Sequence, residues 1–312
     1  MPGPSGETPR ITAGARLTAE EAEQVTRLVT EATDADGVSP LSEHVRLHLR
    51  YGGDDQSRDV LVRTGSEITG YGHLDSPDPS DPAAGPSGEL VIRPAYRRRG
   101  QGLALARALL AETGGQPLRL WAHGDAPAAA ALARAAGFER VRALWQMRRS
   151  LREKLDEPRY RDGVTVRTFV AGRDEDVWLA VNRRAFAHHP EQGSWTRDDI
   201  TLREREPWFD PSGFFLAERG GRLAGFHWTK IHAGGGDAGP DPIGEVYVVG
   251  VDPDEQGTGL GRALTLTGLL YLRSRGLAQV MLYADESNTA AIKLYESLGF
   301  TRYATDVMFR HP

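Results

Sequence analysis

The feature of this sequence that most constrains the fold is a glycine-rich turn within residues 245–262. A β-branched run over 245–251 predicts a buried strand, and apolar periodicity over 262–273 predicts a helix. Between them, Gly259 and Gly261 leave the backbone uncovered, so several N–H groups can point into one concavity at the positive end of the helix. Such a nest suits a phosphate or pyrophosphate. No Lys-Ser or Lys-Thr pair follows the last glycine, which argues against a Walker-type nucleotide loop.

The same pattern occurs a second time, in the first half of the chain. Gly102 corresponds to Gly261 at a separation of 159 positions. Further along, the Gly-Phe pair at 137–138 recurs at 299–300, at an offset of 162. Because the loop, the following helix and the Gly-Phe pair keep the same order, the sequence predicts an internal repeat of domain size.

Length and composition fit two ordinary domains. The chain has 312 residues, of which 39% are hydrophobic and 26% charged, as in a globular protein. A net charge of −5 gives no electrostatic reason to expect nucleic acid or an anionic membrane as a partner, and we expect a monomer. The sequence has no apolar run that predicts a transmembrane helix. The absence of cysteine excludes disulfides and fits a reducing cytoplasm.

The expected elements follow the same order in both halves. Each half has helices and meander strands, then a strand, the glycine loop, a helix, a strand, a helix and a last strand. We therefore expect an α/β (mixed α+β) fold with domains at 1–150 and 164–312, joined by a charged linker at 151–163. In the first domain we expect a frayed tail at 1–12 and a polar loop at 32–38.

Two motifs of the second half occur together. One is Gln-x-x-Gly-x-Gly over residues 256–261, and the other is Asn-x-x-Ala followed by Leu-Tyr-x-x-x-Gly-Phe over 288–300. Together they resemble the GNAT N-acetyltransferase superfamily. Two fused units narrow the resemblance further, to the mycothiol synthase family. The stretches that look like this family are 32–37, 185–193, 226–230 and 244–251.

The resemblance covers nearly the whole chain and implies two tandem GNAT domains, each a mixed, mostly antiparallel sheet flanked by helices. It implies acetyl transfer from acetyl-CoA to the cysteinyl amine of cysteinyl-glucosaminyl-inositol, which gives mycothiol and CoA, without a metal. The acetyl-CoA residues that it implies in the second half are Val249, Gly250, Val251, Gln256, Gly257, Thr258, Gly259, Leu260, Gly261, Arg262, Asn288, Thr289, Ala290, Ala291, Ile292 and Lys293. Those implied in the first half, for a second acetyl-CoA, are Leu90, Val91, Ile92, Arg98, Arg99, Gly100, Gln101, Gly102 and Leu103.

Amine acetylation needs a neutral amine, a polarised thioester carbonyl and a proton for the departing thiolate. We expect Glu245 to take the ammonium proton, directly or through water, and the backbone N–H groups of 249–251 to bind the acetyl oxygen. Tyr295 would donate a proton, or only a hydrogen bond, to the thiolate. For the substrate, the resemblance nominates Asp36, Glu191, Lys230, Glu245 and Tyr283. Because Asp36 belongs to the first domain, we expect the pocket near the interface of the two domains.

The first half departs from this pattern at both proton-handling positions. At the offset of the loop, Glu245 corresponds to Pro86, and at the later offset Tyr295 corresponds to Ala133. We therefore expect the first domain to bind acetyl-CoA, or only to hold its shape, without catalysing transfer. An offset error of a residue or two would bring Glu89 into the position of the base.

Two other functions stay open from the residues alone. One keeps the chemistry but changes the acceptor to a protein N-terminus or an aminoglycoside. The other is a non-catalytic acetyl-CoA sensor or scaffold, against which the presence of Glu245 and Tyr295 speaks. A metal site at His188 and His189 is disfavoured, because no third ligand with a matching spacing occurs.

Overall fold

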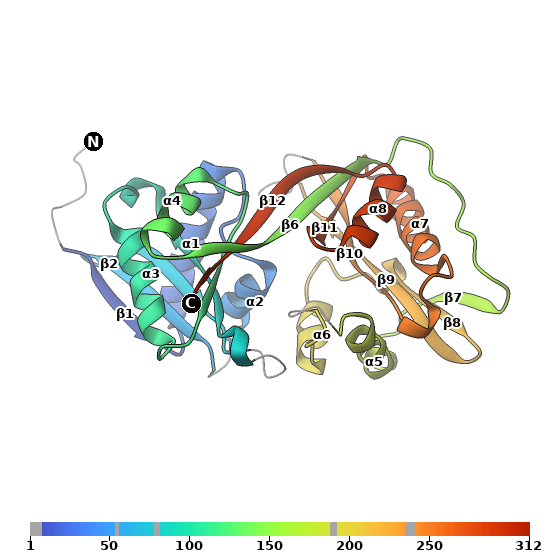
Figure 1. Cartoon of the computed structure of the whole chain (residues 1–312), viewed down its shortest axis with the longest axis horizontal. Coiled ribbons are helices and arrows are strands. Elements are labelled where there is room, and N and C mark those ends of the chain that lie inside the picture. The colour runs from blue at the N-terminus through green and yellow to red at the C-terminus, as the bar shows by residue number, and fades with distance from the viewer. Residues whose placement is uncertain (1–7, 54–55, 78–81, 188–191, 235–240) are drawn as a thin grey trace. The chain divides into compact units, whose positions relative to one another are not determined.

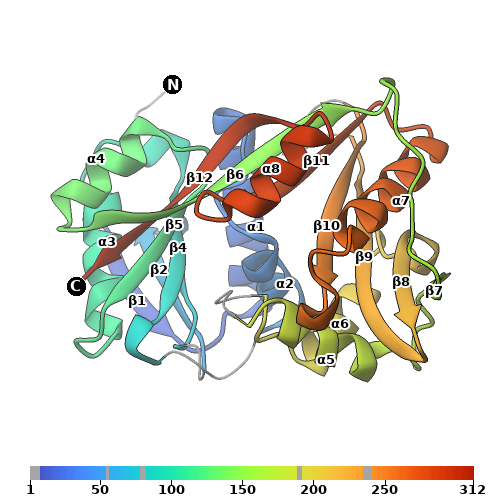
Figure 2. The ribbon, with the colours of Figure 1, turned by 45° about the vertical axis from the view of Figure 1, so that its right-hand side comes forward.

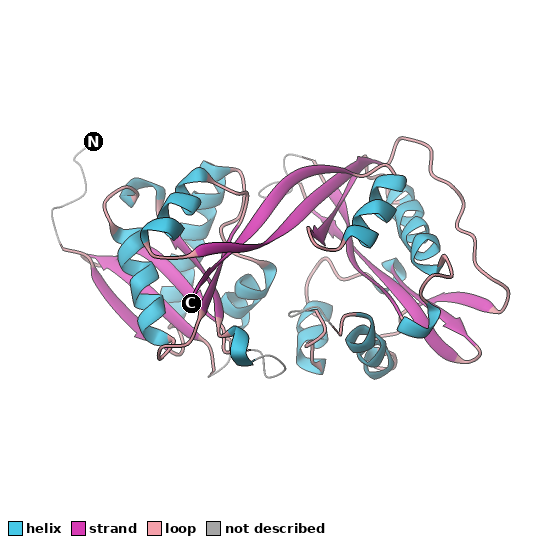
Figure 3. Cartoon of the chain, in the orientation of Figure 1, coloured by secondary structure: helices cyan, strands magenta, loops and turns pink. Residues whose placement is uncertain are grey.

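The computed structural model describes residues 8–53, 56–77, 82–187, 192–234 and 241–312, which fall into two units (Figure 1). Unit 1 comprises Met1–Ala143 and Thr305–Pro312, and unit 2 comprises Leu144–Ala304. In each unit, helices flank the strands of a sheet (Figure 3). Among the described residues, the helices are too short or too polar for any of them to span a lipid bilayer.

Unit 1 is built on a sheet with the strand order β1-β2-β3-β4-β5-β12. All neighbouring strands are antiparallel except β4 and β5, which are parallel. The strands are β1 (Arg10–Gly14), β2 (Arg58–Thr64), β3 (Glu67–Leu74), β4 (Ser87–Ile92), β5 (Leu118–Ala122) and β12 (Thr301–His311). The helices are α1 (Ala19–Asp36), α2 (Glu43–Tyr51), α3 (Gln101–Glu112) and α4 (Pro127–Ala135), with short 3₁₀ turns η1 (Pro82–Ala84) and η2 (Pro94–Tyr96).

Unit 2 repeats this plan with the strand order β6-β11-β10-β9-β8-β7. Here β10 and β11 form the parallel pair, and the other neighbours are antiparallel. The strands are β6 (Glu139–Ser150), β7 (Val164–Thr168), β8 (Phe214–Arg219), β9 (Arg222–His232), β10 (Ile243–Val251) and β11 (Gln279–Asp285). The helices are α5 (Glu175–Ala185), α6 (Arg197–Glu204), α7 (Leu260–Ser274) and α8 (Thr289–Ser297), with 3₁₀ turns η3 (Pro211–Gly213) and η5 (Pro253–Glu255).

Each sheet is covered by apolar helix faces. In unit 1, α1 begins at a capping box in which Thr18 and Glu21 exchange hydrogen bonds, and it buries Val25 and Leu28. In unit 2, a cluster of large aromatic side chains forms much of the core, and the rings of Phe214 on β8 and Trp228 on β9 stack with centroids 4.5 Å apart. Burial of such rings is a dominant favourable term in folding.

The boundaries between the units differ from the expected domains at both ends. Leu144–Ser150 of β6 pairs with β11 and belongs to unit 2, whereas residues 307–311 of β12 pair with β5 and belong to unit 1. β6 and β12, both labelled in Figure 2, have 12 and 11 residues. Local periodicity predicts a strand but not its partner, so the sequence placed these two strands in the wrong units. Residues 151–163, the expected linker, contain no helix or strand and are part of unit 2.

Three local expectations are corrected in unit 1 and one in unit 2. Residues 10–12 of the expected tail belong to β1, and the expected polar loop at 32–38 is helical as far as Asp36. The helix ends at Gly37, whose φ of +71° provides the left-handed cap. The sequence analysis also missed α2 and α6, which have only nine and eight residues and many charged side chains.

Candidate active site

The glycine loop of unit 2 connects β10 to α7 through η5. Gly257 and Gly259 have φ values of +70° and +84°, which disfavour any residue with a Cβ. Gly259 occupies the N-cap of α7 without a side-chain hydrogen bond, and Thr258 Oγ1 donates to the carbonyl of Glu255 at 2.6 Å. The first N–H groups of α7 therefore face the concave side of a fixed loop. This arrangement can hold a phosphate or pyrophosphate.

The two parallel strands beside this loop pair over only a short distance. Gly244 and Glu245 of β10 face Val280 and Met281 of β11, and the recorded register ends there. On its other edge β10 continues to pair with β9 as far as Val251, with an irregularity between Val246 and Val248. Backbone N–H groups at the end of β10 therefore lie beyond the last β10–β11 pair. A carbonyl oxygen could bind there, as expected for 249–251.

Glu245 lies at the start of this diverging segment. Its side chain is only 9% exposed, and its Oε2 lies 2.6 Å from Nε2 of His232 on β9, which donates the hydrogen bond. Lys230 is directly opposite Glu245 in the β9–β10 register. A buried carboxylate that an imidazole N–H holds in position can accept a proton from a bound amine. The sequence analysis missed His232, although its position two residues after Lys230 puts both side chains on one face of β9.

Lys230 lies in an aromatic environment. Its Nζ is 4.3 Å from the ring centroid of Trp208 and 5.0 Å from that of Tyr247. The residue is buried, so these cation–π contacts stabilise its charge in a desolvated position. Tyr247 Oη in turn accepts a hydrogen bond from Arg203 Nε at 2.7 Å. Lys230 is therefore a positioned cation rather than a solvated surface lysine.

Tyr295 lies on α8 within the hydrophobic core of unit 2. Its ring packs against Phe300, with centroids 5.8 Å apart, and burial raises the pKa of Tyr295 to about 12. Within the described chain no hydrogen bond to its hydroxyl is present, so this group keeps its donor capacity. By contrast, Tyr283 on β11 is 41% exposed, and its Oη accepts from Gln146 Nε2 at 2.7 Å.

The start of α8 carries the other expected acetyl-CoA residues. Asn288 is the N-cap, and its side chain accepts from the N–H of Ala291 at 3.1 Å. Thr289, Ala290, Ala291, Ile292 and Lys293 form the first turns of the helix. The Asn288 cap therefore satisfies one of the first N–H groups of α8. The other N–H groups of the first turn point out of the N-terminal end of the helix. On α7, Arg262 donates to Ser297 and to Asp156.

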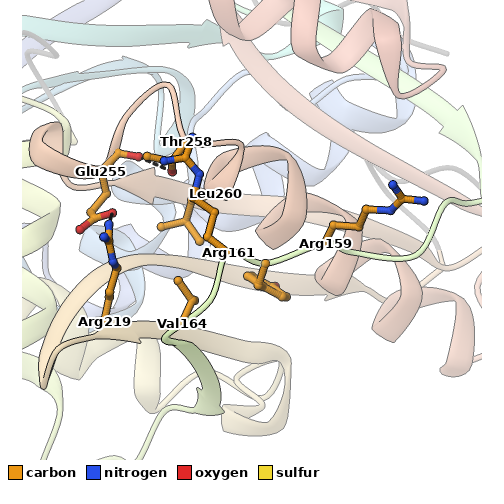
Figure 4. A pocket seen from close by; sticks show the side chains of 8 residues that line it. Arg159, Arg161, Val164, Arg219, Glu255, Thr258 and Leu260 are labelled. Carbon is orange, nitrogen blue, oxygen red and sulfur yellow. Dashed lines mark hydrogen bonds and ion pairs between the residues drawn. The ribbon is translucent and has the colours of Figure 1, made fainter.

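A small pocket borders the outer side of the loop (Figure 4). It includes Thr258 and Leu260 of the loop region, and its arginines are Arg159, Arg161 and Arg219. Arg219 is paired with Glu255 at 2.8 Å. Glu245 and Tyr295 do not line this pocket. The pocket therefore adjoins the phosphate loop and is not the site of acetyl transfer. The sequence analysis assigned 151–163 to a linker and missed this basic surface.

Unit 1 repeats the loop with nearly the same backbone. Arg98 has a φ of +61° where Gly257 has +70°, and Gly100, the N-cap of α3, has +81° where Gly259 has +84°. Arg98 is one of only two non-glycine residues with positive φ in the described chain. Arg99 stacks over the Tyr96 ring at 5.5 Å. The backbone of the nest is thus present in both units.

Several expected residues of unit 1 have other contacts. Gln101 points its side chain into the sheet, where Oε1 accepts from Thr69 Oγ1 at 3.0 Å, so only its backbone is available to a ligand. Leu90, Val91 and Ile92 form β4, and Gly102 and Leu103 lie in the first turn of α3. Asp36 forms a two-pronged ion pair with Arg97 at 2.6 and 2.7 Å, which ties it to the first loop. Glu191, His188 and His189 lie outside the described residues.

The correspondence between Tyr295 and Ala133 is confirmed by the backbone. The N–H of Phe138 donates to the carbonyl of Ala133, as the N–H of Phe300 donates to that of Tyr295. Pro86, the expected counterpart of Glu245, precedes β4, and its carbonyl accepts from Arg119. The sheet carboxylate of unit 1 is instead Glu89, as the alternative alignment allowed.

Glu89 is enclosed by donors from its own unit. It is 3% exposed, its Oε2 accepts from the N–H of Ser42 at 2.7 Å, and its Oε1 faces His123 Nε2 at 3.4 Å. The opposite ring nitrogen of His123 faces Asp306 at 3.0 Å. Both oxygens of Glu89 are therefore engaged within the folded unit.

Comparison with known proteins identifies the family. The model of the acetyltransferase (GNAT) family matches residues 180–300. A mycothiol acetyltransferase of Thermobispora bispora is 60% identical over 95% of this chain and 97% of its own length. One of Streptosporangium roseum is 55% identical over 96% and 99%. The chain belongs to the mycothiol acetyltransferase family.

Solved structures agree with this membership at the level of the fold. A tandem GNAT protein from the clavulanic acid biosynthesis pathway has a TM-score of 0.70 at 22% identity, and the match covers 96% of this chain and 98% of that one. A GCN5-related N-acetyltransferase from Sphaerobacter thermophilus has a TM-score of 0.65 at 24% identity, over 96% and 95%. The expected GNAT fold, a mixed and mostly antiparallel sheet in each unit, is thus confirmed for this mycothiol acetyltransferase family member.

Proposed function

We propose that this chain transfers acetyl from acetyl-CoA to the cysteinyl amine of cysteinyl-glucosaminyl-inositol (1D-myo-inositol 2-(L-cysteinylamino)-2-deoxy-α-D-glucopyranoside), giving mycothiol and CoA. What carries the proposal is that a chain of this family has, in unit 2, an open anion nest, a diverging strand pair and a buried carboxylate held by an imidazole. The reaction would take place in unit 2.

Proton removal from the acceptor would fall to Glu245. An α-amino group with a pKa of about 8 is mostly an ammonium ion at neutral pH and must lose a proton before it attacks. The carboxylate of Glu245, alone or through a water, would take this proton, and His232 would hold the carboxylate in position. The amine then attacks the thioester carbon, the C–N bond forms, the nitrogen releases a second proton to solvent and the C–S bond breaks.

Charge on the acetyl oxygen would be stabilised by backbone N–H groups at 249–251, beyond the last β10–β11 pair. The departing thiolate would face Tyr295. A phenol with a pKa of about 12 is a much weaker acid than a thiol of pKa about 8.5, so full proton transfer is uphill by about 5 kcal/mol. We therefore propose that Tyr295 donates a hydrogen bond to the sulfur, which takes its proton from the ammonium through Glu245 or from solvent.

For the substrate we propose contacts with Lys230 and Tyr283, which lie on β9 and β11 on either side of β10. A polyol offers hydroxyl groups to the ammonium of Lys230 and to the partly exposed phenol of Tyr283. Glu191 stays a nominee from the resemblance. Asp36 is a weaker nominee, because Arg97 already engages both of its oxygens.

We further propose that unit 1 holds a second acetyl-CoA in its glycine loop without turning it over. The loop supports binding, since its backbone repeats that of unit 2. The enclosed carboxylate of Glu89 and the alanine at position 133 support the lack of turnover. The thiol substrate needs reducing conditions, so we propose a cytoplasmic location. We also propose that the protein is a monomer.

The acceptor decides between this function and its alternatives. Acetyl-CoA turnover should be measured with cysteinyl-glucosaminyl-inositol, with glucosaminyl-inositol that lacks the cysteine, and with a peptide that begins with cysteine. We expect rapid transfer only to the first, with one acetyl group added and a free thiol retained, as seen by mass spectrometry and thiol titration. Equal or faster transfer to the peptide, or to an aminoglycoside, would overturn the proposal.

A further inference from the structure

Unit 1 contains a group of imidazoles and carboxylates that acetyl transfer does not use. It joins the start of α2 to strands β2 and β3 and consists of His44, His48, Asp59, His73 and Asp75. His44 and His48 are four residues apart on α2, so they share one helix face. His73 lies on β3, and Asp75 follows directly after the end of this strand, with its carboxylate 3.0 Å from the His73 ring. The fold thus brings three imidazoles and two carboxylates together from three elements.

The most open part of this group is centred on Asp75. Its Oδ1 lies 2.9 Å from Nε2 of His44 and 3.0 Å from Nε2 of His73. These three atoms all lie within 4.8 Å of one another. A tetrahedral ion with bonds of about 2.0–2.2 Å needs ligand atoms about 3.3 Å apart, so small adjustments would admit one.

The other side of the His73 ring is already fixed. Nδ1 of His73 lies 3.1 Å from Oδ1 of Asp59, and the same oxygen accepts from Tyr71 Oη at 2.7 Å. Asp59 and His73 are fully or nearly fully buried. Asp59 accepts from Nδ1–H, as the partners of metal-binding histidines do, and a bound ion would take the place of the proton that Nε2 of His73 directs at Asp75. Asp59 therefore presents Nε2 of His73 towards Asp75 and His44.

Formal charge also favours a divalent cation. Carboxylates at neutral pH carry two negative charges in this small volume, from Asp59 and Asp75. A cation of charge +2 would balance them once the Nε2 proton of His73 has been displaced. Access is possible, since the side chains of His44 and Asp75 are 54% and 29% exposed while those of Asp59 and His73 are enclosed.

We propose that unit 1 binds a divalent transition metal, with Zn²⁺ preferred, through His44 Nε2, His73 Nε2 and Asp75 Oδ1. Two imidazole nitrogens and one carboxylate oxygen are typical zinc ligands, and water would complete the tetrahedron. The ion fastens the first turn of α2 to β3. Since the N–H of Ser42, the N-cap of α2, donates to Glu89, the ion also secures the cover over that carboxylate.

The test uses the full chain, produced without a polyhistidine tag and stripped of metal with a chelator. Zn²⁺ is titrated calorimetrically, and Co²⁺ is added as a spectroscopic probe whose visible bands report tetrahedral geometry. We expect one Zn²⁺ per chain, a tetrahedral Co²⁺ spectrum and a melting temperature that rises with Zn²⁺. His44→Ala, an exposed change that leaves the core intact, should weaken Zn²⁺ binding at least about 100-fold and abolish the thermal shift.

The matched control is His311→Ala, which removes a histidine of unit 1 that contacts Phe138 instead of a carboxylate. It should bind Zn²⁺ like the wild type. Equal Zn²⁺ affinity in the wild type and His44→Ala would mean an adventitious ion and overturn the proposal. Loss of binding in His48→Ala with retention in His44→Ala would place the ion between His48, Asp59 and His73, and would overturn this ligand set.

Discussion

The two units share a loop backbone and differ in the groups around it. Gly100 and Gly259 both cap a helix with φ values of +81° and +84°, and Arg98 adopts the left-handed conformation that Gly257 has in unit 2. In both units the parallel strand pair is recorded over two positions only. The machinery that a phosphate and a thioester need from the backbone is therefore present twice.

The carboxylates separate the units. Glu245 has an imidazole partner on the adjacent strand, whereas Glu89 is enclosed by the N–H of Ser42 and by His123. A carboxylate whose oxygens already accept from fixed donors is a poor base, since protonation would break those hydrogen bonds. The comparison indicates that the loop, which both units share, predicts cofactor binding. The surroundings of the carboxylate, which differ, predict which unit catalyses transfer.

The largest expected effect distinguishes the two loops. Gly259→Glu and Gly100→Glu are matched changes, because both positions have similar positive φ and no atom within 4 Å of an added Cβ. Each places a carboxylate in a phosphate nest, where like-charge contact costs several kcal/mol. We expect Gly259→Glu to raise KM for acetyl-CoA by about 100-fold or more, as measured by steady-state kinetics.

Gly100→Glu should leave turnover within about twofold of the wild-type value, because like-charge contact in this nest affects only unit 1. It should also remove one bound acetyl-CoA per chain, as measured by calorimetry. Loss of turnover in this variant would show that the reaction depends on unit 1 and would break the comparison.

Tyr295→Phe gives a smaller effect whose size sharpens the role of the phenol. A hydrogen bond to the departing sulfur is worth about 1.4 kcal/mol, or about a tenfold drop in kcat. A proton donor would contribute about 10²- to 10⁴-fold. With a pKa of about 12 for Tyr295, we expect the smaller drop. A kcat loss above about 100-fold, with an unchanged melting temperature, would mean that Tyr295 transfers its proton.

The smallest effect concerns stability in unit 1. Burial lowers the pKa of His123, but hydrogen bonds to Asp306 and Glu89 outweigh burial and raise this pKa to about 10. Because the pKa is raised on folding, the stabilisation is complete below about pH 6.5 and is lost as pH rises through about 10. Asp306→Asn should therefore lower the melting temperature by a few degrees at pH 6, and less at pH 10. An equal loss at both pH values would show that charge on His123 is irrelevant.

Local patterns in the sequence were enough to predict the loops. Glycine at 100 and 259 permits the positive φ that the turn requires, and glycine at 102 and 261 leaves the start of the helix uncovered, so strand, turn and helix follow from neighbouring residues. The repeat then predicted that Ala133 corresponds to Tyr295, and the backbone hydrogen bonds confirm this correspondence. The positive φ of Arg98 was not evident, since arginine rarely adopts it.

Contacts between distant positions were beyond local patterns. His123 meets Asp306 over 183 positions, and Gln146 meets Tyr283 over 137, because β6 and β12 divide their residues between the units. The burial of Glu89 depends on α2, a helix of nine residues that the sequence analysis did not predict. The resemblance to a family could nominate Glu245, but the sequence could not show which imidazole holds it.

The most direct test of the account compares Glu245→Gln with Glu89→Gln. Both replace a buried sheet carboxylate by an amide of nearly the same size, one in each unit. The measurement is kcat for acetyl transfer to cysteinyl-glucosaminyl-inositol at saturating acetyl-CoA. We predict a drop of about 10²- to 10⁴-fold for Glu245→Gln and a change within about twofold for Glu89→Gln. Full activity in Glu245→Gln, or its loss in Glu89→Gln, would contradict the assignment of catalysis to unit 2.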